Sequence, residues 1–128
     1  MKVVREGDVR LLEAPAPYPR RARVLLDAAT VGEELAASLG ISYYAPGERA
    51  DFHRHASDEL MLVLEGTGYI EGEDGRHRLQ PRCAIYVPAA EAHAVVNDGS
   101  SPLVFAFVYV PAGPEQKTKV QWRAVEEG

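Results

Sequence analysis

The stretch from Gly47 to Gly66 constrains this chain more than any other feature of its sequence. It places His53 and His55 two residues apart, puts a carboxylate at Glu59 and has a glycine at each end. Side chains on an extended strand repeat every two residues, so both imidazoles would face the same side. Neutral imidazoles are good ligands for divalent transition metals. If the strand breaks after His55 and restarts shortly afterwards, the Glu59 carboxylate joins them as an oxygen ligand.

A second segment supplies a third candidate histidine. His93 stands at the start of an apolar run that follows a turn marked by Pro88. The remaining histidine near the middle of the chain, His77, comes just after a predicted hairpin turn and is expected to be solvated. A single histidine is more often a hydrogen-bonded core residue than a ligand. Several histidines and a carboxylate at these spacings are a more specific indication of a metal site. The residues that together predict a metal site are His53, His55, Glu59 and His93.

The two segments resemble the two sequence motifs of the cupin superfamily. The first motif, G-x5-H-x-H-x3-E-x6-G, is matched at every position between Gly47 and Gly66. The second motif, G-x5-P-x-G-x2-H-x3-N, is matched at three positions: Pro88, His93 and Asn97. Arg82 and Ala90 stand where the family usually has glycine. Because glycine often supplies a positive φ, these two departures bear on the turn geometry and leave the candidate ligand in place.

The distribution of apolar runs and turn signals predicts the fold class. Many short strand-like runs, closely spaced turns and no convincing long helix are typical of an all-β sandwich or barrel. The resemblance narrows this to the cupin jelly roll, a double-stranded β-helix barrel with a metal inside its mouth. The 128 residues are enough for a single domain, residues 1–128. We expect N-terminal strands and a proline-rich arm in 1–23, the barrel core in 39–110, and a C-terminal tail with one short strand in 111–128.

The N-terminal region contains two segments whose structure the sequence leaves open. Prolines at every second position from Pro15 to Pro19, followed by three arginines within residues 20–23, favour an extended arm over the domain surface. An anion-binding patch is the alternative for these arginines. Residues 31–37 fit a helical turn on propensity, and we interpret this region as mostly β.

The strand predicted over residues 58–65 is apolar on both faces. Met61 and Val63 would line the interior on the same side as Glu59. The opposite face carries Leu60, Leu62 and Leu64, which need a further layer from outside. A second subunit or the N-terminal arm would supply that layer, and the pattern favours a homodimer.

The wall of the predicted pocket is mostly apolar and aromatic. Its candidate residues are Tyr43 or Tyr44, Met61, Phe105, Phe107 and Tyr109. Such stripes are more often plain core than a substrate site. Arg49 and Arg54 flank the first motif, and Arg54 is expected to point outward if its two neighbouring histidines point inward.

Composition limits the possible partners. A net charge of −5 argues against a general nucleic-acid surface, and no apolar run approaches the length of a membrane span. The N-terminus lacks the long apolar region of a signal peptide. The lone cysteine, Cys83, cannot form an internal disulfide, which favours a reducing cytoplasm. We therefore expect a cytoplasmic protein whose partner is a small molecule, with neither nucleic acid nor membrane.

The ligand set indicates a class of chemistry. Three imidazoles and one carboxylate leave open positions on an octahedral ion, as in catalytic rather than structural sites. We predict one divalent transition-metal ion per chain, chosen from Fe, Mn, Ni, Co, Cu and Zn. The resemblance implies an enzyme acting on a small organic molecule by dioxygenase-type or isomerase/lyase-type chemistry. The alternative is a non-catalytic, metal-containing protein that binds a sugar or carboxylate.

Overall fold

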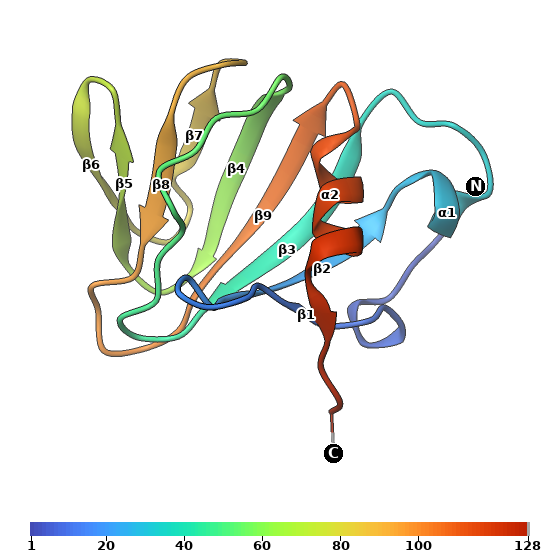
Figure 1. Ribbon diagram of the computed structural model, residues 1–128, viewed down its shortest axis with the longest axis horizontal. Helices are drawn as coiled ribbons and strands as arrows, with labels where there is room; N and C mark the ends of the chain where they lie inside the picture. Colours follow the sequence, from blue (N-terminus) through green and yellow to red (C-terminus); the bar gives the residue numbers. More distant parts are fainter. Residues whose placement is uncertain (128) are drawn as a thin grey trace.

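Two antiparallel β-sheets form the framework of residues 1–127, the part of the chain that the computed structural model describes (Figure 1). The larger sheet has the strand order β10-β1-β2-β3-β9-β4-β7, and the smaller has the order β6-β5-β8. The predicted all-β architecture is confirmed. The strands are β1 (Leu12–Glu13), β2 (Arg21–Leu26), β3 (Ser38–Tyr44), β4 (Asp58–Glu65), β5 (Gly68–Gly72), β6 (Gly75–Leu79), β7 (Ala84–Val87), β8 (His93–Val96), β9 (Leu103–Val110) and β10 (Arg123–Ala124). The helices are the 3-10 turn η1 (Glu6–Asp8), α1 (Ala28–Val31) and α2 (Pro114–Gln121).

Strand β9 occupies the centre of the larger sheet and pairs with both β3 and β4. Its side chains alternate in the way its sequence predicts, so Phe105 and Phe107 are buried in the core. Gly40 in β3 leaves the space that the Phe107 ring fills, because a Cβ at this glycine would lie 2.3 Å from the ring. Apolar side chains of both sheets therefore meet in one core, which includes Ile70 from β5 and Val95 from β8.

Strand β4 is apolar on both faces, but the described chain covers only one of them. Met61 and Val63 are buried in the core. The opposite face exposes Leu60 at 45%, Leu62 at 42% and Leu64 at 43%. The N-terminal arm does not cover these leucines, because β1 pairs with β2 and β10 at the other end of the sheet. The sequence suggested that either the N-terminal arm or a second subunit covers this face. The second subunit remains the candidate, and the homodimer stays a prediction.

The proline-rich arm connects β1 to β2, and its residues 15–19 are exposed, as expected for an arm over the domain surface. Its residues Ala14 to Tyr18 also line a cavity. Arg21 donates to the Glu13 carboxylate at 3.1 Å, and Arg23 pairs with Glu127. These two arginines are therefore already neutralised, which disfavours an anion patch on the outer side of the arm.

Helix α2 is the main difference from the predicted secondary structure, because no helix was expected in the C-terminal tail. The short strand expected in the tail, around residues 120–123, is present as β10, slightly later in the chain. The helix begins with a proline at its first position and has Glu115 in its first turn. It lacks an apolar stripe and is held by polar contacts: the buried Glu115 carboxylate accepts from Ser38 Oγ at 2.7 Å, and Lys119 Nζ donates to Asp27 Oδ2 at 2.7 Å. Hydrophobic periodicity in the sequence therefore does not predict this helix. No helix within residues 1–127 has the length and apolar character needed to cross a bilayer.

Residues 28–37 contain one short helix and a loop. Asp27 caps α1: its carboxylate accepts from the Thr30 backbone N–H at 3.0 Å, and Gly32 ends the helix in the left-handed region. The helical turn therefore lies slightly before the segment 31–37 that was interpreted as mostly β, and β3 starts at Ser38. Trp122, directly after α2, packs against the core as expected.

The two positions at which the second motif lacks glycine keep a glycine-like backbone. Arg82 has a φ of 75° and Ala90 has a φ of 69°, both in the left-handed region that glycine adopts at little cost. We expect Ala90→Gly to raise the free energy of unfolding by about 0.5–1 kcal/mol, because the relief of strain exceeds the added entropy of the unfolded chain. Denaturant unfolding measures this change.

The exposed neighbour Ala89 is the matched control for that substitution, because it has no positive φ. Ala89→Gly should lower the free energy of unfolding by about 0.4–1 kcal/mol. Equal effects of the two substitutions would mean that the left-handed turn at Ala90 stores no strain.

Candidate metal centre

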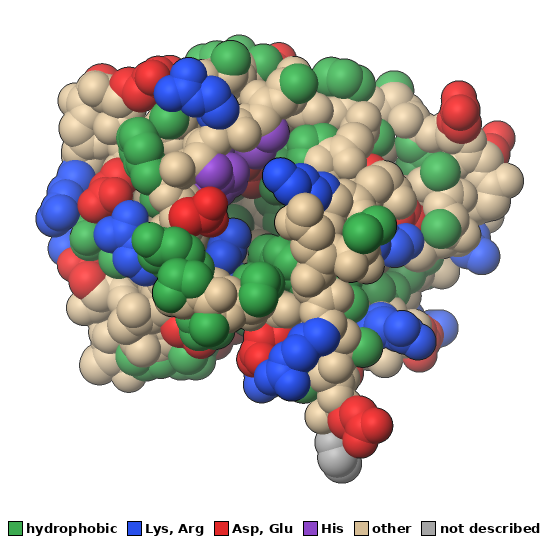
Figure 2. Space-filling model, viewed as in Figure 1, with side chains coloured by type: hydrophobic (Ala, Val, Ile, Leu, Met, Phe, Trp, Pro, Cys, Tyr) green, Lys and Arg blue, Asp and Glu red, His purple; other side chains and the backbone are tan. Residues whose placement is uncertain are grey.

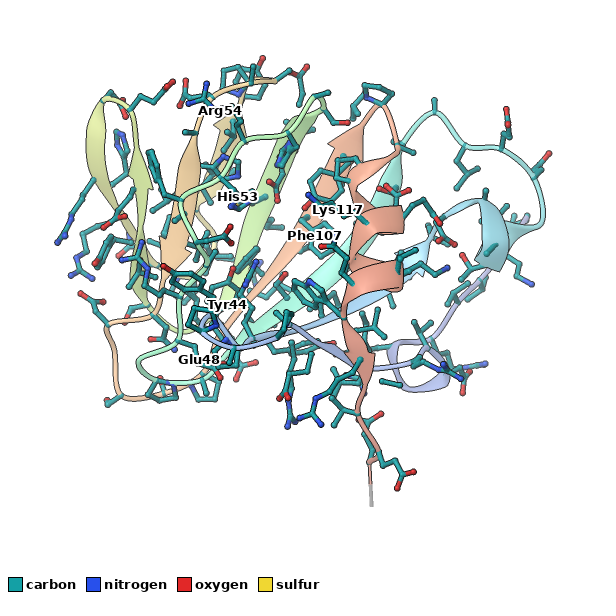
Figure 3. All side chains as sticks on the ribbon, in the orientation of Figure 1. Tyr44, Glu48, His53, Arg54, Phe107 and Lys117 are labelled. Carbon is teal, nitrogen blue, oxygen red and sulfur yellow. The ribbon has the colours of Figure 1, made fainter. Side chains whose placement is uncertain are left out.

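The four predicted ligands come from both sheets and from the loop between β3 and β4. Glu59 is the second residue of β4 in the larger sheet, and His93 is the first residue of β8 in the smaller one. His53 and His55 lie on the connecting loop, and Figure 3 shows His53 over the interior between the sheets. The expectation that both histidines lie on an extended strand is therefore wrong. The predicted break before Glu59 is present, because β4 begins at Asp58.

One isolated bridge fixes the loop to strand β8. The His53 N–H donates to the His93 carbonyl at 3.1 Å, and the His93 N–H donates back to the His53 carbonyl at 2.9 Å. The Ala90 N–H donates to the His55 carbonyl at 2.8 Å, which ties the left-handed turn to the same loop. Backbone pairing thus brings together histidines that are about forty residues apart in the sequence.

The Nδ1 atom of each of the three histidines faces a backbone carbonyl. His53 Nδ1 lies 2.8 Å from the Asp51 oxygen, His55 Nδ1 lies 3.0 Å from the Ser57 oxygen, and His93 Nδ1 lies 2.9 Å from the Glu91 oxygen. A carbonyl only accepts, so each Nδ1 carries the proton and donates. In the neutral imidazole this leaves the Nε2 lone pair free on all three rings.

Two of these Nε2 atoms converge on one carboxylate oxygen. Glu59 Oε1 lies 3.0 Å from His55 Nε2 and 3.2 Å from His93 Nε2. Possible ligand atoms of the three histidines all lie within 4.8 Å of one another. The Glu59 side chain is almost fully buried, at 4% exposure, so this negative charge depends on its neighbours for stabilisation.

The pKa values in the cluster follow from burial and from these contacts. Burial alone would raise the pKa of the Glu59 carboxyl, but hydrogen bonds from His55 and His93 outweigh it and lower the pKa. Burial alone would lower the pKa of His93, whereas its hydrogen bond to Glu59 raises the pKa above the ordinary value. Burial lowers the pKa of His53, which has no such bond to the carboxylate. The group is therefore arranged to hold a positive charge between its rings and Glu59.

The histidine cluster opens into a cavity of about 350 Å³. Figure 2 shows the histidine side chains at the edge of a hollow on this face, with Lys and Arg side chains beside it. The sequence-predicted wall residues that line the cavity are Tyr44, Met61, Phe105, Phe107 and Tyr109. Tyr43 does not line it, because its hydroxyl donates to the Glu6 carboxylate on the other face of β3. Burial raises the pKa of Tyr44 to about 12 and the pKa of Tyr109 well above 10, so both hydroxyls stay protonated near neutral pH.

Several cavity residues were not predicted as part of the pocket. Arg20 was considered only as part of an anion-binding patch on the proline-rich arm, and α2 with the residue that follows it contributes Lys117, Thr118, Gln121 and Trp122. The proline spacing of the arm indicated an extended course without indicating its location. Both segments reach the cavity through long-range contacts, for which the local sequence carries no signal.

Three other residues considered in the sequence lie outside the cluster. His77 is exposed on the β5–β6 hairpin, and its Nε2 lies 3.0 Å from Asp74 Oδ1, in agreement with the solvated role expected for it. Arg54 is exposed at the cavity rim, where its guanidinium lies 4.0 Å from Glu73 Oε1. Cys83 is partly buried against the core.

A β-barrel of two facing sheets, with three histidines and one glutamate clustered at one opening, belongs to the cupin class of folds. The family model described as a cupin domain matches residues 40–109, which is more than half of the chain. The protein therefore belongs to the cupin family, and the predicted jelly-roll fold is confirmed.

Relatives and solved structures show the range of proteins that this chain resembles. Dimethylsulfoniopropionate lyase DddW from Ruegeria pomeroyi is 34% identical over 77 residues, which cover 60% of this chain and 50% of the lyase. Tetracenomycin polyketide synthase protein TcmJ from Streptomyces glaucescens is 30% identical over 93 residues, 72% of this chain and 62% of TcmJ. The polyketide cyclase RemF from Streptomyces resistomycificus superposes with a TM-score of 0.76 at 23% identity, covering 100% of this chain and 87% of that one. The chain thus spans about half the length of the lyase, and the likeness to RemF concerns the fold.

Proposed function

We propose that this cupin is a metal-dependent enzyme that acts on a small organic molecule in the cavity beside the histidine cluster. His53, His55 and His93 would bind one divalent transition-metal ion through Nε2, and Glu59 would complete the set with a carboxylate oxygen. The observation that carries the proposal is the convergence of the Nε2 atoms of His55 and His93 on Glu59 Oε1, at 3.0 and 3.2 Å.

The donor chemistry of these residues fits such an ion. Because backbone carbonyls hold the Nδ1 protons, the neutral rings present Nε2 lone pairs toward a carboxylate, an arrangement that requires a cation between them. A proton satisfies this need in the metal-free protein, and a divalent ion satisfies it for all four residues at once. Nitrogen and oxygen donors in this ratio suit Fe, Mn, Ni, Co, Cu or Zn.

The chain's own residues would bind and orient the substrate. A bound ion would supply Lewis-acid or redox chemistry. Tyr109 lies against His55, with ring centroids 5.1 Å apart, and its protonated hydroxyl would donate a hydrogen bond to a substrate oxygen. Phe105 and Phe107 form an apolar wall that excludes water and strengthens polar contacts inside the cavity. With both tyrosines protonated, neither serves as a base near neutral pH.

Lyase or isomerase chemistry and dioxygenase chemistry both fit this site. The similarity to the lyase DddW supports the first type. The cavity is large enough for an organic substrate beside the ligand cluster, and the ligand set would leave coordination positions open for either route.

The proposal is tested by elemental analysis of protein that has been purified without a histidine tag. We expect about one divalent transition-metal ion per chain. Bound metal should decrease as the pH falls, because protons compete for Nε2; the raised pKa of His93 means that this competition begins above the ordinary imidazole range of about 6.5. Oxygen uptake with candidate substrates then separates dioxygenase from redox-neutral chemistry. Protein that binds none of the six metals at neutral pH would refute the proposal.

A further inference from the structure

The residues that line the cavity are more basic than the chain as a whole. The sequence carries a net charge of −5, yet three cationic side chains line the cavity: Arg20, Arg54 and Lys117. Only two carboxylates, Asp51 and Glu59, line it as well. Glu59 already faces two histidines, Asp51 lies 3.7 Å from Arg20, and Glu73 outside the cavity lies 4.0 Å from Arg54. Lys117 is therefore the cavity cation that the described carboxylates leave uncompensated. A small anion would therefore be attracted to this cavity despite the acidic character of the protein.

Arg20 is a partly buried and oriented cation in the cavity wall. Its side chain is 12% exposed, its guanidinium lies 5.0 Å from the centroid of the Trp122 ring, and Nη1 donates to the Tyr18 carbonyl at 2.8 Å. Nη2 lies 3.7 Å from Asp51 Oδ1, an ion-pair distance that is too long for a hydrogen bond, and the guanidinium also interacts with the Tyr44 hydroxyl. A guanidinium has five N–H donors, so these contacts leave Arg20 with donors for a ligand in the cavity.

Lys117 reaches the cavity from helix α2, which ends next to Trp122. Figure 3 shows it near Phe107, across the cavity from His53. No carboxylate among the described residues lies within 4.0 Å of its Nζ, whereas Lys119, two residues further along the same helix, is bound to Asp27. The contacts of Glu115 and Lys119 fix the helix, so that Lys117 is held over the cavity.

We propose that Arg20 and Lys117 form a carboxylate-binding subsite, and that the substrate or ligand of this cavity is a small organic acid with an aromatic body. The aromatic part would contact Phe105, Phe107 and Trp122. The carboxylate would receive the free guanidinium donors of Arg20, a geometry that suits planar carboxylates. The substrate class named here extends the proposed function, but the subsite itself does not require a bound metal.

Two matched probes test the subsite: 2-naphthoate, which is an aromatic carboxylate, and 2-naphthamide, which has the same shape without the charge. Calorimetry gives both dissociation constants, for metal-free and for zinc-loaded protein. The indole N–H of Trp122, the only tryptophan in the chain, reports by NMR whether a probe enters this cavity. In the metal-free protein we expect naphthoate to bind at least about tenfold more tightly than naphthamide and to shift the Trp122 signal.

Single substitutions then assign the preference to its residues. Arg20→Gln should reduce the naphthoate preference by about tenfold or more, and Lys117→Gln by about threefold, because Lys117 is more exposed to solvent. The matched control is Lys2→Gln, which removes an equal charge from an exposed residue that does not line the cavity. It should leave the ratio of the two dissociation constants unchanged. If Arg20→Gln does not fold, Lys117→Gln and Arg20→Lys decide the question.

The outcomes separate this inference from the proposed function. A naphthoate preference that appears only after zinc loading, or that survives both glutamine substitutions, would assign carboxylate recognition to the metal and overturn the subsite. Failure of naphthoate to bind the metal-free protein would overturn it as well. A preference that depends on Arg20 and Lys117 in protein that binds no metal would support the subsite and refute the metal-dependent enzyme.

Discussion

His53→Ala is expected to reduce the bound metal from about one ion per chain to less than about one tenth, with the fold unchanged. The side chain of His53 is about one-third exposed and makes a single hydrogen bond, to the Asp51 carbonyl. Its loss therefore removes one of four proposed ligands and little packing. Replacement even of groups that only orient a ligand typically costs 10–100-fold in metal affinity, so the loss of a ligand should cost at least about 100-fold. Elemental analysis after dialysis measures the content, and circular dichroism monitors the fold.

The chain offers a matched control for this substitution. His77 is also a partly exposed histidine, and it bonds to Asp74 on a hairpin away from the cavity. His77→Ala should keep the full metal content. His93→Ala should also lose the metal, but with some loss of stability, since this ring is buried against Glu59. Equal metal content in His53→Ala and His77→Ala would show that the histidine cluster does not hold the ion.

The cluster of three histidines and Glu59 was predictable from the sequence because motif spacing constrains the fold through the backbone. The register that places Glu59 on the inner face of β4 also buries Met61 and Val63, so the apolar pattern and the ligand position specify the same strand orientation. The backbone conformation of the loop that carries His53 was less predictable. His53 lies on a loop with a single bridge to His93, a contact that no strand periodicity encodes.

The cavity wall could be predicted only where it is built from strands. Phe105 and Phe107 follow the two-residue alternation of β9, which is visible in the sequence. Arg20 and Lys117 are almost a hundred residues apart, and what brings them to one cavity is the docking of α2 through Glu115 and Lys119. Polar contacts of this kind leave no hydrophobic pattern, so this helix and the position of Lys117 were found only in the structure, whereas the arginines of residues 20–23 were noted from the sequence without their place at the cavity.

Asn97→Ala is expected to have the opposite effect to His53→Ala: a large loss of stability with metal ligands intact. Asn97 is 0% exposed. Its Nδ2 donates to the Tyr44 carbonyl at 2.8 Å and to the Ser101 carbonyl at 3.0 Å, while its Oδ1 accepts from the Gly99 N–H at 2.9 Å. The side chain therefore joins the end of β3 to the turn after β8. Alanine would leave these backbone groups without partners, at a cost of about 3 kcal/mol in the free energy of unfolding.

Ser100→Ala in the same turn is the control, because Ser100 is exposed and should change the free energy of unfolding by less than about 0.5 kcal/mol. Denaturant unfolding of metal-free protein measures both variants, and elemental analysis of the folded fraction measures their metal content. A stable Asn97→Ala variant that had lost its metal would place this residue in the ion-binding group. A destabilised variant with full metal content would mean that the last residue of the second motif acts on the barrel, by closing the turn that follows the strand of His93.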